Sequence, residues 1–347
     1  MTTTSSTLRA VSRFTSPIRQ TIVALVAACV PVLVAAQSVL RWSELTAVQI
    51  GALDREHTVV LIPAGIVAEQ GSLLPSGAEL FRSERMAADL ADVIGSRAGW
   101  TAVLLPPVPL GSGAFDRRSG RDGFSGTLAV RASTVQAIFT DLATALGEQG
   151  LRHVFIVDGQ ADANHARALD LAGDYFAANF PGKMIHLLGR NGCDPRTLQA
   201  PPITLLGATA MTADVDSPHA GVMQTSRDWF LRPELVDSLA LRAASDVSAN
   251  GADAWTRTVQ RPDWPGYIGA PRFANLELGK WLYDTELRSC SALALRFLDG
   301  LPESTVPRFA DRMRAYPDVR ALLTAQARRD EDVVARQKRA IETVKRP

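Results

Sequence analysis

The residues His57–Glu79, with the sequence HTVVLIPAGIVAEQGSLLPSGAE, decide the fold of this chain. They open with an apolar run that has no polar alternation, the pattern of a strand buried on both faces of a parallel sheet. A polar loop with Glu69 and Gln70 follows, and a predicted helix begins near Glu79. A buried strand that ends in a polar loop and leads into a helix is the repeating unit of α/β proteins.

The same kind of apolar segment recurs downstream. Further strands are predicted at WTAVLLPP (100–107), HVFIVDG (153–159) and KMIHLLG (183–189). Amphipathic helices are predicted at 79–96, 133–150 and 163–180. The second of these has Ser133 as its predicted N-cap and Gly150 as its end. We therefore predict an α/β fold with three layers, α/β/α, around a mainly parallel sheet, and a mostly helical chain after Ser226.

Length and charge set the broad class of the protein. The 347 residues are 46% apolar, which is enough for one large domain with a sizeable core. The chain has 37 Lys and Arg residues against 36 Asp and Glu, so it has no net field that would attract a polyanion. We therefore expect no nucleic-acid partner.

The N-terminus has the pattern of a secretory signal. Arg9, Arg13 and Arg19 precede the apolar run TIVALVAACVPVLVAA, which ends in small residues at Ala36. The run is short for a membrane span, which needs about 20 residues, so cleavage and export are favoured over a retained membrane anchor. We predict a signal peptide at 1–36, an α/β domain at 37–305 and a charged helical extension at 306–347. The mature protein is then periplasmic or secreted, with no membrane contact beyond the signal segment.

Two cysteines remain after removal of the predicted signal peptide. In an oxidising compartment Cys193 and Cys290 can form a disulfide. They can equally be two unrelated small apolar side chains. The sequence leaves both alternatives open.

Polar residues follow three of the predicted strands. Glu69 follows the first, the loop Ser112–Phe124 follows the second, and Asp158–Asp162 follows the third. Ligands of open parallel sheets bind beyond the carboxyl ends of the strands, so these three loops are the candidate site. In the second loop Arg117, Arg118 and Arg121 would favour an anionic ligand. Further along the chain, Trp255, Trp264 and Tyr267 either cover this site or anchor their own loop on the core.

Several motifs resemble those of the creatininase, or creatinine amidohydrolase, family. EQGSLLP stands where that family has Glu-Gln-His-Gly-x-His-Leu-Pro, and VFIVDGQADAN stands where it has a strand ending in Asn-Gly-His. DSPHAGVMQTS is similar to its His-Ala-Gly-x-x-Glu-Thr-Ser. The resemblance implies a metal-dependent hydrolase that cleaves a non-peptide C–N bond in a small or cyclic amide, and a homo-oligomer.

The resemblance also implies a set of site residues. The positions of metal ligands are occupied by Glu69, Glu79 and Asp162, and His219 retains the family's imidazole, for which we predict a catalytic role. Other polar residues predicted at the rim are Asp158, Gln160 and Gln224. Two histidine ligands of the family are absent, since Gly71 and Gln160 stand at their positions.

The loss of both imidazoles leaves two functions open. Three carboxylates can form an oxygen-only site that suits Mn, Mg or Ca better than Zn. The alternative is a chain that binds no metal and uses the same cleft to bind a small polar molecule, or that serves in assembly without catalysis. Whether the protein is an enzyme is therefore undecided at the level of sequence.

Overall fold

The computed structural model describes residues 39–113, 124–213, 219–249 and 251–344. The predicted signal peptide at 1–36 and the arginines Arg117, Arg118 and Arg121 lie outside these residues. No helix in the described part of the chain is long and apolar enough to cross a membrane.

Five parallel strands of the described residues form one sheet, in the order β1-β3-β2-β4-β5. They are β1 (Leu40–Arg41), β2 (Thr58–Ala64), β3 (Thr101–Leu104), β4 (His153–Asp158) and β5 (Lys183–His186). Every residue of β2 is buried, and Leu61 is paired with Leu104 of β3 on one side and with Phe155 of β4 on the other. The four strands predicted from the sequence are confirmed, and β1 is an additional edge strand beside β3.

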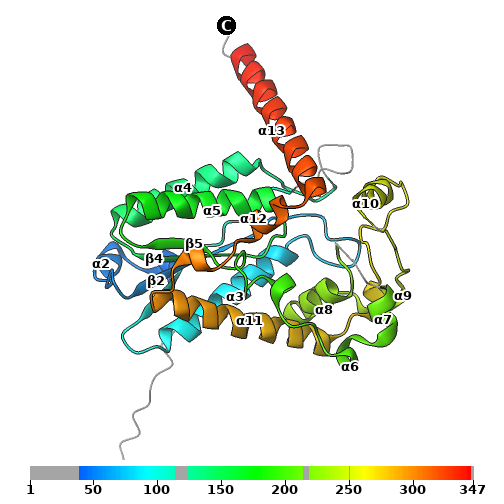
Figure 1. The fold of residues 1–347 in the computed structure, drawn as a ribbon, viewed down its shortest axis with the longest axis horizontal. Helices are drawn as coiled ribbons and strands as arrows, with labels where there is room; N and C mark the ends of the chain where they lie inside the picture. Colours follow the sequence, from blue (N-terminus) through cyan, green and yellow to red (C-terminus); the bar gives the residue numbers. More distant parts are fainter. Residues whose placement is uncertain (1–38, 114–123, 214–218, 250, 345–347) are drawn as a thin grey trace, which may run out of the picture. The chain divides into compact units, whose positions relative to one another are not determined.

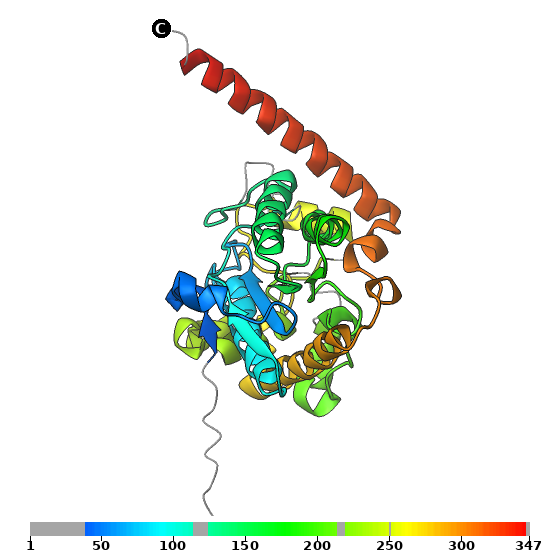
Figure 2. The same ribbon diagram turned by 90° about the vertical axis from the view of Figure 1, so that its left-hand side faces the viewer.

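Alternate residues of the central strand enter two separate apolar cores. The helices that cover the sheet are α3 (Ala78–Gly95), α4 (Ala132–Glu148), α5 (Ala163–Asn179) and α11 (Leu276–Leu298). Val59 and Leu61 pack in one core with α3 and α11, whereas Val60 and Ile62 pack in the other with α4 and α5. This follows from the two-residue period of a strand. Figures 1 and 2 show the sheet between the two helix layers, which confirms the predicted α/β/α architecture.

The start of α4 differs from the prediction. Ser133 is not the N-cap, because the helix begins at Ala132 and the cap position, two residues earlier than predicted, is occupied by Arg131 without a capping side chain. Instead, Oδ2 of Asp330, from the C-terminal helix, accepts a hydrogen bond from the Ala132 N–H at 3.4 Å. A distant carboxylate thus satisfies one of the N–H groups that a local cap would otherwise satisfy.

The second half of the chain is mostly helical, as predicted. Its shorter helices are α6 (Ile203–Leu206), α7 (Ala208–Ala213), α8 (Val222–Leu231), α9 (Ser238–Ala243) and α10 (Ala252–Val259), and the first half also has α2 (Ala47–Gly51). α8 lies very close to α11 at Gly279. A Cβ atom at this position would be only 2.0 Å from the Ser226 carbonyl oxygen, so only glycine allows this approach. The Ser226 hydroxyl is buried there and accepts a hydrogen bond from the Asn275 N–H at 3.1 Å. This close packing fixes the position of α8.

The C-terminal helices α12 (Phe309–Arg314) and α13 (Pro317–Val344) pack on α5. Phe309 and Leu323 join Ala163 and Ala166 in a small buried cluster. Asn164 Nδ2 also donates a hydrogen bond to Gln326 Oε1 at 2.8 Å. The beginning of the C-terminal segment is therefore held against the first turn of α5.

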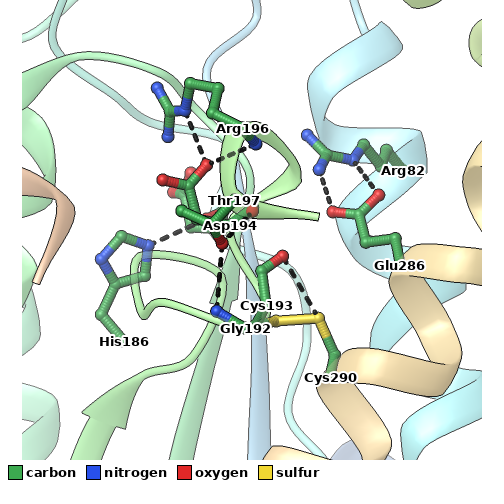
Figure 3. Close-up of a disulfide and its surroundings, with 10 residues drawn as sticks. Arg82, His186, Gly192, Cys193, Asp194, Arg196, Thr197, Glu286 and Cys290 are labelled. Carbon is green, nitrogen blue, oxygen red and sulfur yellow. Dashed lines mark hydrogen bonds and ion pairs between the residues drawn. A yellow bond between two sulfur atoms is a disulfide. The ribbon is translucent and has the colours of Figure 1, made fainter. Parts of the chain in front are cut away.

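A disulfide joins the loop after β5 to α11. Cys193 and Cys290 are bonded, with 4.5 Å between their Cα atoms, and both are fully buried (Figure 3). Of the two alternatives that the sequence left open, the structure shows the paired one. The bond connects segments that are 97 residues apart in the chain.

Candidate functional site

A cavity of about 430 Å³ lies at the carboxyl ends of the strands. Five of the residues predicted for the site line it: Glu79, Gln160, Asp162, His219 and Gln224. Glu69 and Asp158 are not in the lining, but each contacts a histidine near it. Residues as far apart in the sequence as Glu79 and Gln224, 145 positions, thus line one cavity at the strand ends.

Glu69 holds His219 in place. Its Oε2 atom lies 3.0 Å from His219 Nε2, and its Oε1 atom accepts a hydrogen bond from the Gly71 N–H. The Glu69 N–H in turn donates to Thr127 Oγ1 at 2.9 Å. Glu69 is therefore committed to contacts inside its own loop and to His219, which faces the cavity.

The backbone at Gly71 leaves no room for a larger residue. Gly71 has φ +79°, a conformation that disfavours side chains, and a Cβ atom there would lie 2.9 Å from the Gly266 carbonyl oxygen. A Cβ atom at Gly266 would lie 2.4 Å from Glu69 Oε1. The imidazole that the family carries at the position of Gly71 is thus excluded by the fold of this loop, as well as missing from the sequence.

The two glutamines bind neighbouring protein groups. Gln224 Nε2 donates to Gln70 Oε1 at 2.6 Å and links α8 to the first loop. Gln160 Nε2 donates to the Ser112 carbonyl oxygen at 2.6 Å. A Cβ atom at Gly111 would lie 2.4 Å from Gln160 Oε1, so the glycine is needed to seat this side chain. Both amides connect the loops that form the cavity.

Two carboxylates, one at the end of β4 and one at the start of α5, stabilise the turn between them. Asp162 is the N-cap of α5, where Oδ1 accepts hydrogen bonds from the N–H groups of Asn164 and His165. Asp158 is fully buried, and its Oδ2 atom lies 2.8 Å from His165 Nε2. Burial opposes ionisation of Asp158, but the adjacent His165 outweighs it and lowers the pKa of this carboxyl. Asp158 is thus paired with His165 inside the protein.

Arg82 lies one helical turn after Glu79 and is bound on two sides. Its guanidinium forms a two-point pair with Glu286 of α11, in which the Nε–Oε2 distance is 3.2 Å (Figure 3). Its Nη1 atom donates to the Gly159 carbonyl oxygen at 3.3 Å and lies 3.9 Å from Glu79 Oε2. Burial raises the pKa of Glu79 to about 7, despite the opposing effect of Arg82. Glu79 is therefore only partly ionised near neutral pH.

Arg227 lines the same cavity from α8. Its side chain is 13% exposed, and it makes no hydrogen bond to any described residue. The Nε atom lies 3.9 Å from Oδ1 of Asp228, which is too far for a hydrogen bond. Burial lowers the pKa of Arg227 and raises that of Asp228. The Arg227 guanidinium thus reaches the cavity with its donors unsatisfied by these neighbours.

The remaining lining comes mainly from the loop after β5 and from the C-terminal helices. Arg196 donates from Nε to Asp194 Oδ1 at 2.6 Å and stacks 3.6 Å from the centre of the Phe309 ring. The apolar part of the lining includes Met223, Trp255, Phe309, Met313, Val319, Leu322 and Leu323. Trp255 thus faces the cavity, and it is also anchored by a hydrogen bond from Nε1 to the Ala249 carbonyl oxygen at 2.6 Å.

Sequence reasoning missed the three arginines and the apolar wall. A usable signal existed for Arg82, because a residue three positions after Glu79 lies on the same helix face. Arg227 follows Gln224 at the same spacing in α8. No local signal pointed to Phe309 or Leu323, since their segment is charged and their contacts are with α5.

Comparison with known proteins identifies the family. A family model described as Creatininase, creatinine amidohydrolase, matches residues 43–294. The chain belongs to the creatininase family. No match was found among curated protein sequences.

Solved creatininase structures share the fold. A tryptophan-to-phenylalanine mutant creatininase, described as Type II, has a TM-score of 0.58 at 18% identity, covering 75% of this chain and 99% of its own. A putative creatinine amidohydrolase from Bacteroides fragilis has a TM-score of 0.53 at 20% identity, covering 77% and 99%. A manganese creatininase gives 0.55 at 17% identity, covering 75% and 99%. The structural similarity at these low identities establishes the fold alone. The family as a whole is one of hydrolases.

The described carboxylates of this creatininase-family chain are not grouped as a metal centre. Other creatininase structures are described as a manganese form and a zinc–zinc form. Among residues 39–113, 124–213, 219–249 and 251–344, no three His, Cys, Asp or Glu side chains are grouped so that they could hold a metal ion. Glu69 is bound to His219, Asp162 caps α5, and Glu79 lies beside Arg82. The buried oxygens Glu79 Oε2 and Gln160 Oε1 have no hydrogen-bond partner, but Glu79 Oε2 lies 3.9 Å from the guanidinium of Arg82.

Proposed function

We propose that this creatininase-family protein binds a small polar molecule in the strand-end cavity without using a metal ion. One observation carries the proposal: the buried guanidinium of Arg82 lies 3.9 Å from Glu79, a carboxyl group at a metal-ligand position of the family. The side chain of Arg82 is 3% exposed and is held by Glu286 and the Gly159 carbonyl oxygen. The guanidinium of Arg82, which is always positively charged, thus lies beside a position at which the family has a metal ligand.

The electrostatic cost of adding a metal ion supports this proposal. Two unit charges 4 Å apart interact by about 4 kcal/mol at an effective dielectric constant near 20, so a divalent ion at that distance from Arg82 meets a repulsion of about 8 kcal/mol. Glu286 offsets part of this repulsion, but its oxygens are already bonded to Arg82.

A second candidate function is metal-free hydrolysis with His219 as a general base. The observation in its favour is the 3.0 Å contact between His219 Nε2 and Glu69, since a carboxylate that orients an imidazole is a common feature of acid–base sites. It also agrees with the hydrolase activity of the family. Ring opening of small cyclic amides to amino acids, or release of amine or ammonia from open-chain amides, abolished in His219→Asn, would favour hydrolysis over binding alone.

Metal analysis tests the primary proposal. The mature chain is purified without chelator, its metal content is measured, and thermal unfolding is followed with Mn²⁺, Mg²⁺, Ca²⁺ or Zn²⁺ added. We expect far less than one ion per chain and no change in melting temperature, whereas a bound ion at a hundredfold excess over Kd would add about 2.7 kcal/mol of stability. Glu331→Gln, on the exposed side of α13, is the matched control for Glu79→Gln. A stoichiometric ion whose stabilising effect is lost in Glu79→Gln but kept in Glu331→Gln would refute metal-free binding.

The cellular location, assembly and domain limits belong to this proposal as well. We propose export with cleavage after Ala36, a homo-oligomer, and the division of the mature chain into 37–305 and 306–347. The buried disulfide supports export, since such bonds persist mainly in oxidising compartments. Mass spectrometry of protein from its native host tests the cleavage, and an intact N-terminus on the soluble protein would contradict it.

Light scattering of the purified protein tests the assembly, and a monomeric mass would contradict it.

A further inference from the structure

Three arginines line the cavity, and two of them have strong partners within the chain. Arg82 is paired with Glu286, and Arg196 is bonded to the fully buried carboxylate of Asp194. Arg227 differs, because it makes no hydrogen bond to any described residue and its Nε atom is buried. A buried donor without an acceptor is costly, and the Nε–H group of Arg227 is such a donor. The cavity therefore presents one cation that is suited to binding a ligand.

The acidic groups of the cavity do not balance this cation. Asp162 accepts two backbone hydrogen bonds at the start of α5. Glu79 faces Arg82 instead, with its Oε2 atom 3.9 Å from Arg82 Nη1. Asp228 lies near Arg227 but burial raises its pKa, which weakens it as a partner. The cavity wall around Arg227 thus favours a negatively charged group.

A different part of the same cavity is apolar. It is formed by α12 and the first two turns of α13, through Phe309, Met313, Val319, Leu322 and Leu323. Apolar walls of this kind recognise hydrocarbon, at about 0.8 kcal/mol for each methylene group that is buried. The volume of about 430 Å³ lies in the range of pockets for small organic ligands. A small ion such as phosphate would leave this wall without a partner.

We propose that the cavity binds a small organic monocarboxylate, with its carboxylate paired to Arg227 and its hydrocarbon part against α12 and α13. The planar fork of a guanidinium matches the two oxygens of a carboxylate. The single guanidinium of Arg227 suits a ligand with one carboxylate. Its helix, α8, is fixed in position because Gly279 lets α8 and α11 pack closely. This inference rests on the proposed metal-free binding and specifies its ligand class.

Calorimetric titration of chelator-treated protein tests the carboxylate. The probes are hexanoate, its neutral analogue hexanamide, and inorganic phosphate. Hydrogen bonds to charged groups contribute about 1.5–3 kcal/mol, so we expect hexanoate to bind about 10- to 100-fold more tightly than hexanamide. Arg227→Gln should lose the same factor, and Arg227→Lys should recover part of it. The control Arg288→Gln, an exposed change on α11 with the same loss of charge, should bind hexanoate like the wild type.

The apolar wall has its own test. Affinity should rise about fourfold for each added methylene from propionate to hexanoate, which corresponds to about 0.8 kcal/mol. Leu322→Ser should flatten this dependence while leaving propionate binding unchanged. Circular dichroism of every variant shows whether it is folded, so that lost binding is not mistaken for unfolding.

The possible outcomes separate the two proposals. Hexanoate binding that requires added Mn²⁺ or Zn²⁺ would refute metal-free binding itself. Metal-free binding that is equal for hexanamide, unchanged in Arg227→Gln, or stronger for phosphate would overturn only the assignment of a carboxylate to Arg227. Failure of every carboxylate to bind at millimolar concentration would also overturn that assignment.

Discussion

Arg82 and Arg227 line the same cavity but have different surroundings. Arg82 is bound by Glu286 on two atoms and by the Gly159 carbonyl oxygen. Arg227 has only a 3.9 Å ion pair with Asp228 among the described residues. A buried ion with satisfied donors belongs to the structure, whereas one with unsatisfied donors is able to bind something else. The charge alone does not show which role an arginine has.

The largest expected effect is that of Arg82→Met. This change leaves Glu286, which is 1% exposed, without its partner. Breaking a buried ion pair on one side costs about 3–5 kcal/mol, so the free energy of unfolding measured in urea should fall by that amount. The double variant Arg82→Met/Glu286→Leu should recover most of the loss. If the single variant were as stable as the wild type, Arg82 would not be structural and the comparison would fail.

The disulfide lies one helical turn from Glu286 and gives the next largest effect. Replacing both Cys193 and Cys290 with Ser should lower the free energy of unfolding by about 2–4 kcal/mol, because a long loop in the unfolded chain is then no longer closed. Urea unfolding with and without reductant measures this. The expected result is a loss of stability in the wild type on reduction and none in the double variant. Equal curves for the reduced and oxidised wild type would contradict it.

The pH dependence of stability reports on the environment of Glu79, which lies beside Arg82. Its pKa is raised from 4.5 in the unfolded chain to about 7 in the folded protein. The folded state therefore binds the proton more tightly, and the stability that this contributes is present below pH 4.5 and lost as the pH rises through about 7. We expect the free energy of unfolding to fall by about 1–3 kcal/mol over this window.

Glu79→Gln isolates that contribution. The buried Asp170 also has a pKa raised to about 7, so the variant should retain part of the pH dependence but less than the wild type. It should also be more stable than the wild type at about pH 8. An identical pH dependence of unfolding in both proteins would show that Glu79 ionises normally.

The smallest expected effect is that of Arg227→Gln on stability. Because this guanidinium makes no hydrogen bond to the described residues, removing it breaks none of them and also removes a buried charge. The free energy of unfolding should change by less than about 1 kcal/mol, in contrast to Arg82→Met. A loss as large as that of Arg82→Met would mean that Arg227 has a structural role and would remove the distinction between them.

The sequence predicted the fold well because its signals are local. The unbroken apolar run at Val59–Ile62 identifies a buried strand without knowledge of its neighbours. The polar residues after the strands, including Asp162 and Gln160, were placed at one edge by the geometry of parallel sheets alone. The cavity that Asp162 and Gln160 line lies at this edge.

Other features were beyond reach because they depend on distant partners. Arg82 reads as an ordinary charge on an amphipathic helix until Glu286, 204 residues later, is brought beside it. Ser133 is a reasonable cap by composition, but Asp330 supplies the acceptor from α13. The closure of the loop at Gly71 depends on Gly266. In each case, the contact that determines the local structure is made by a segment far away in the sequence, which a local sequence pattern does not predict.

The disulfide also changes the connectivity of the molecule. The bond between Cys193 and Cys290 turns the intervening chain, which includes His219, Gln224 and Arg227, into a closed covalent ring. Cutting a ring once does not divide it. A protease that cleaves at a single peptide bond inside this ring therefore leaves the two fragments attached, and they separate on a denaturing gel only after reduction.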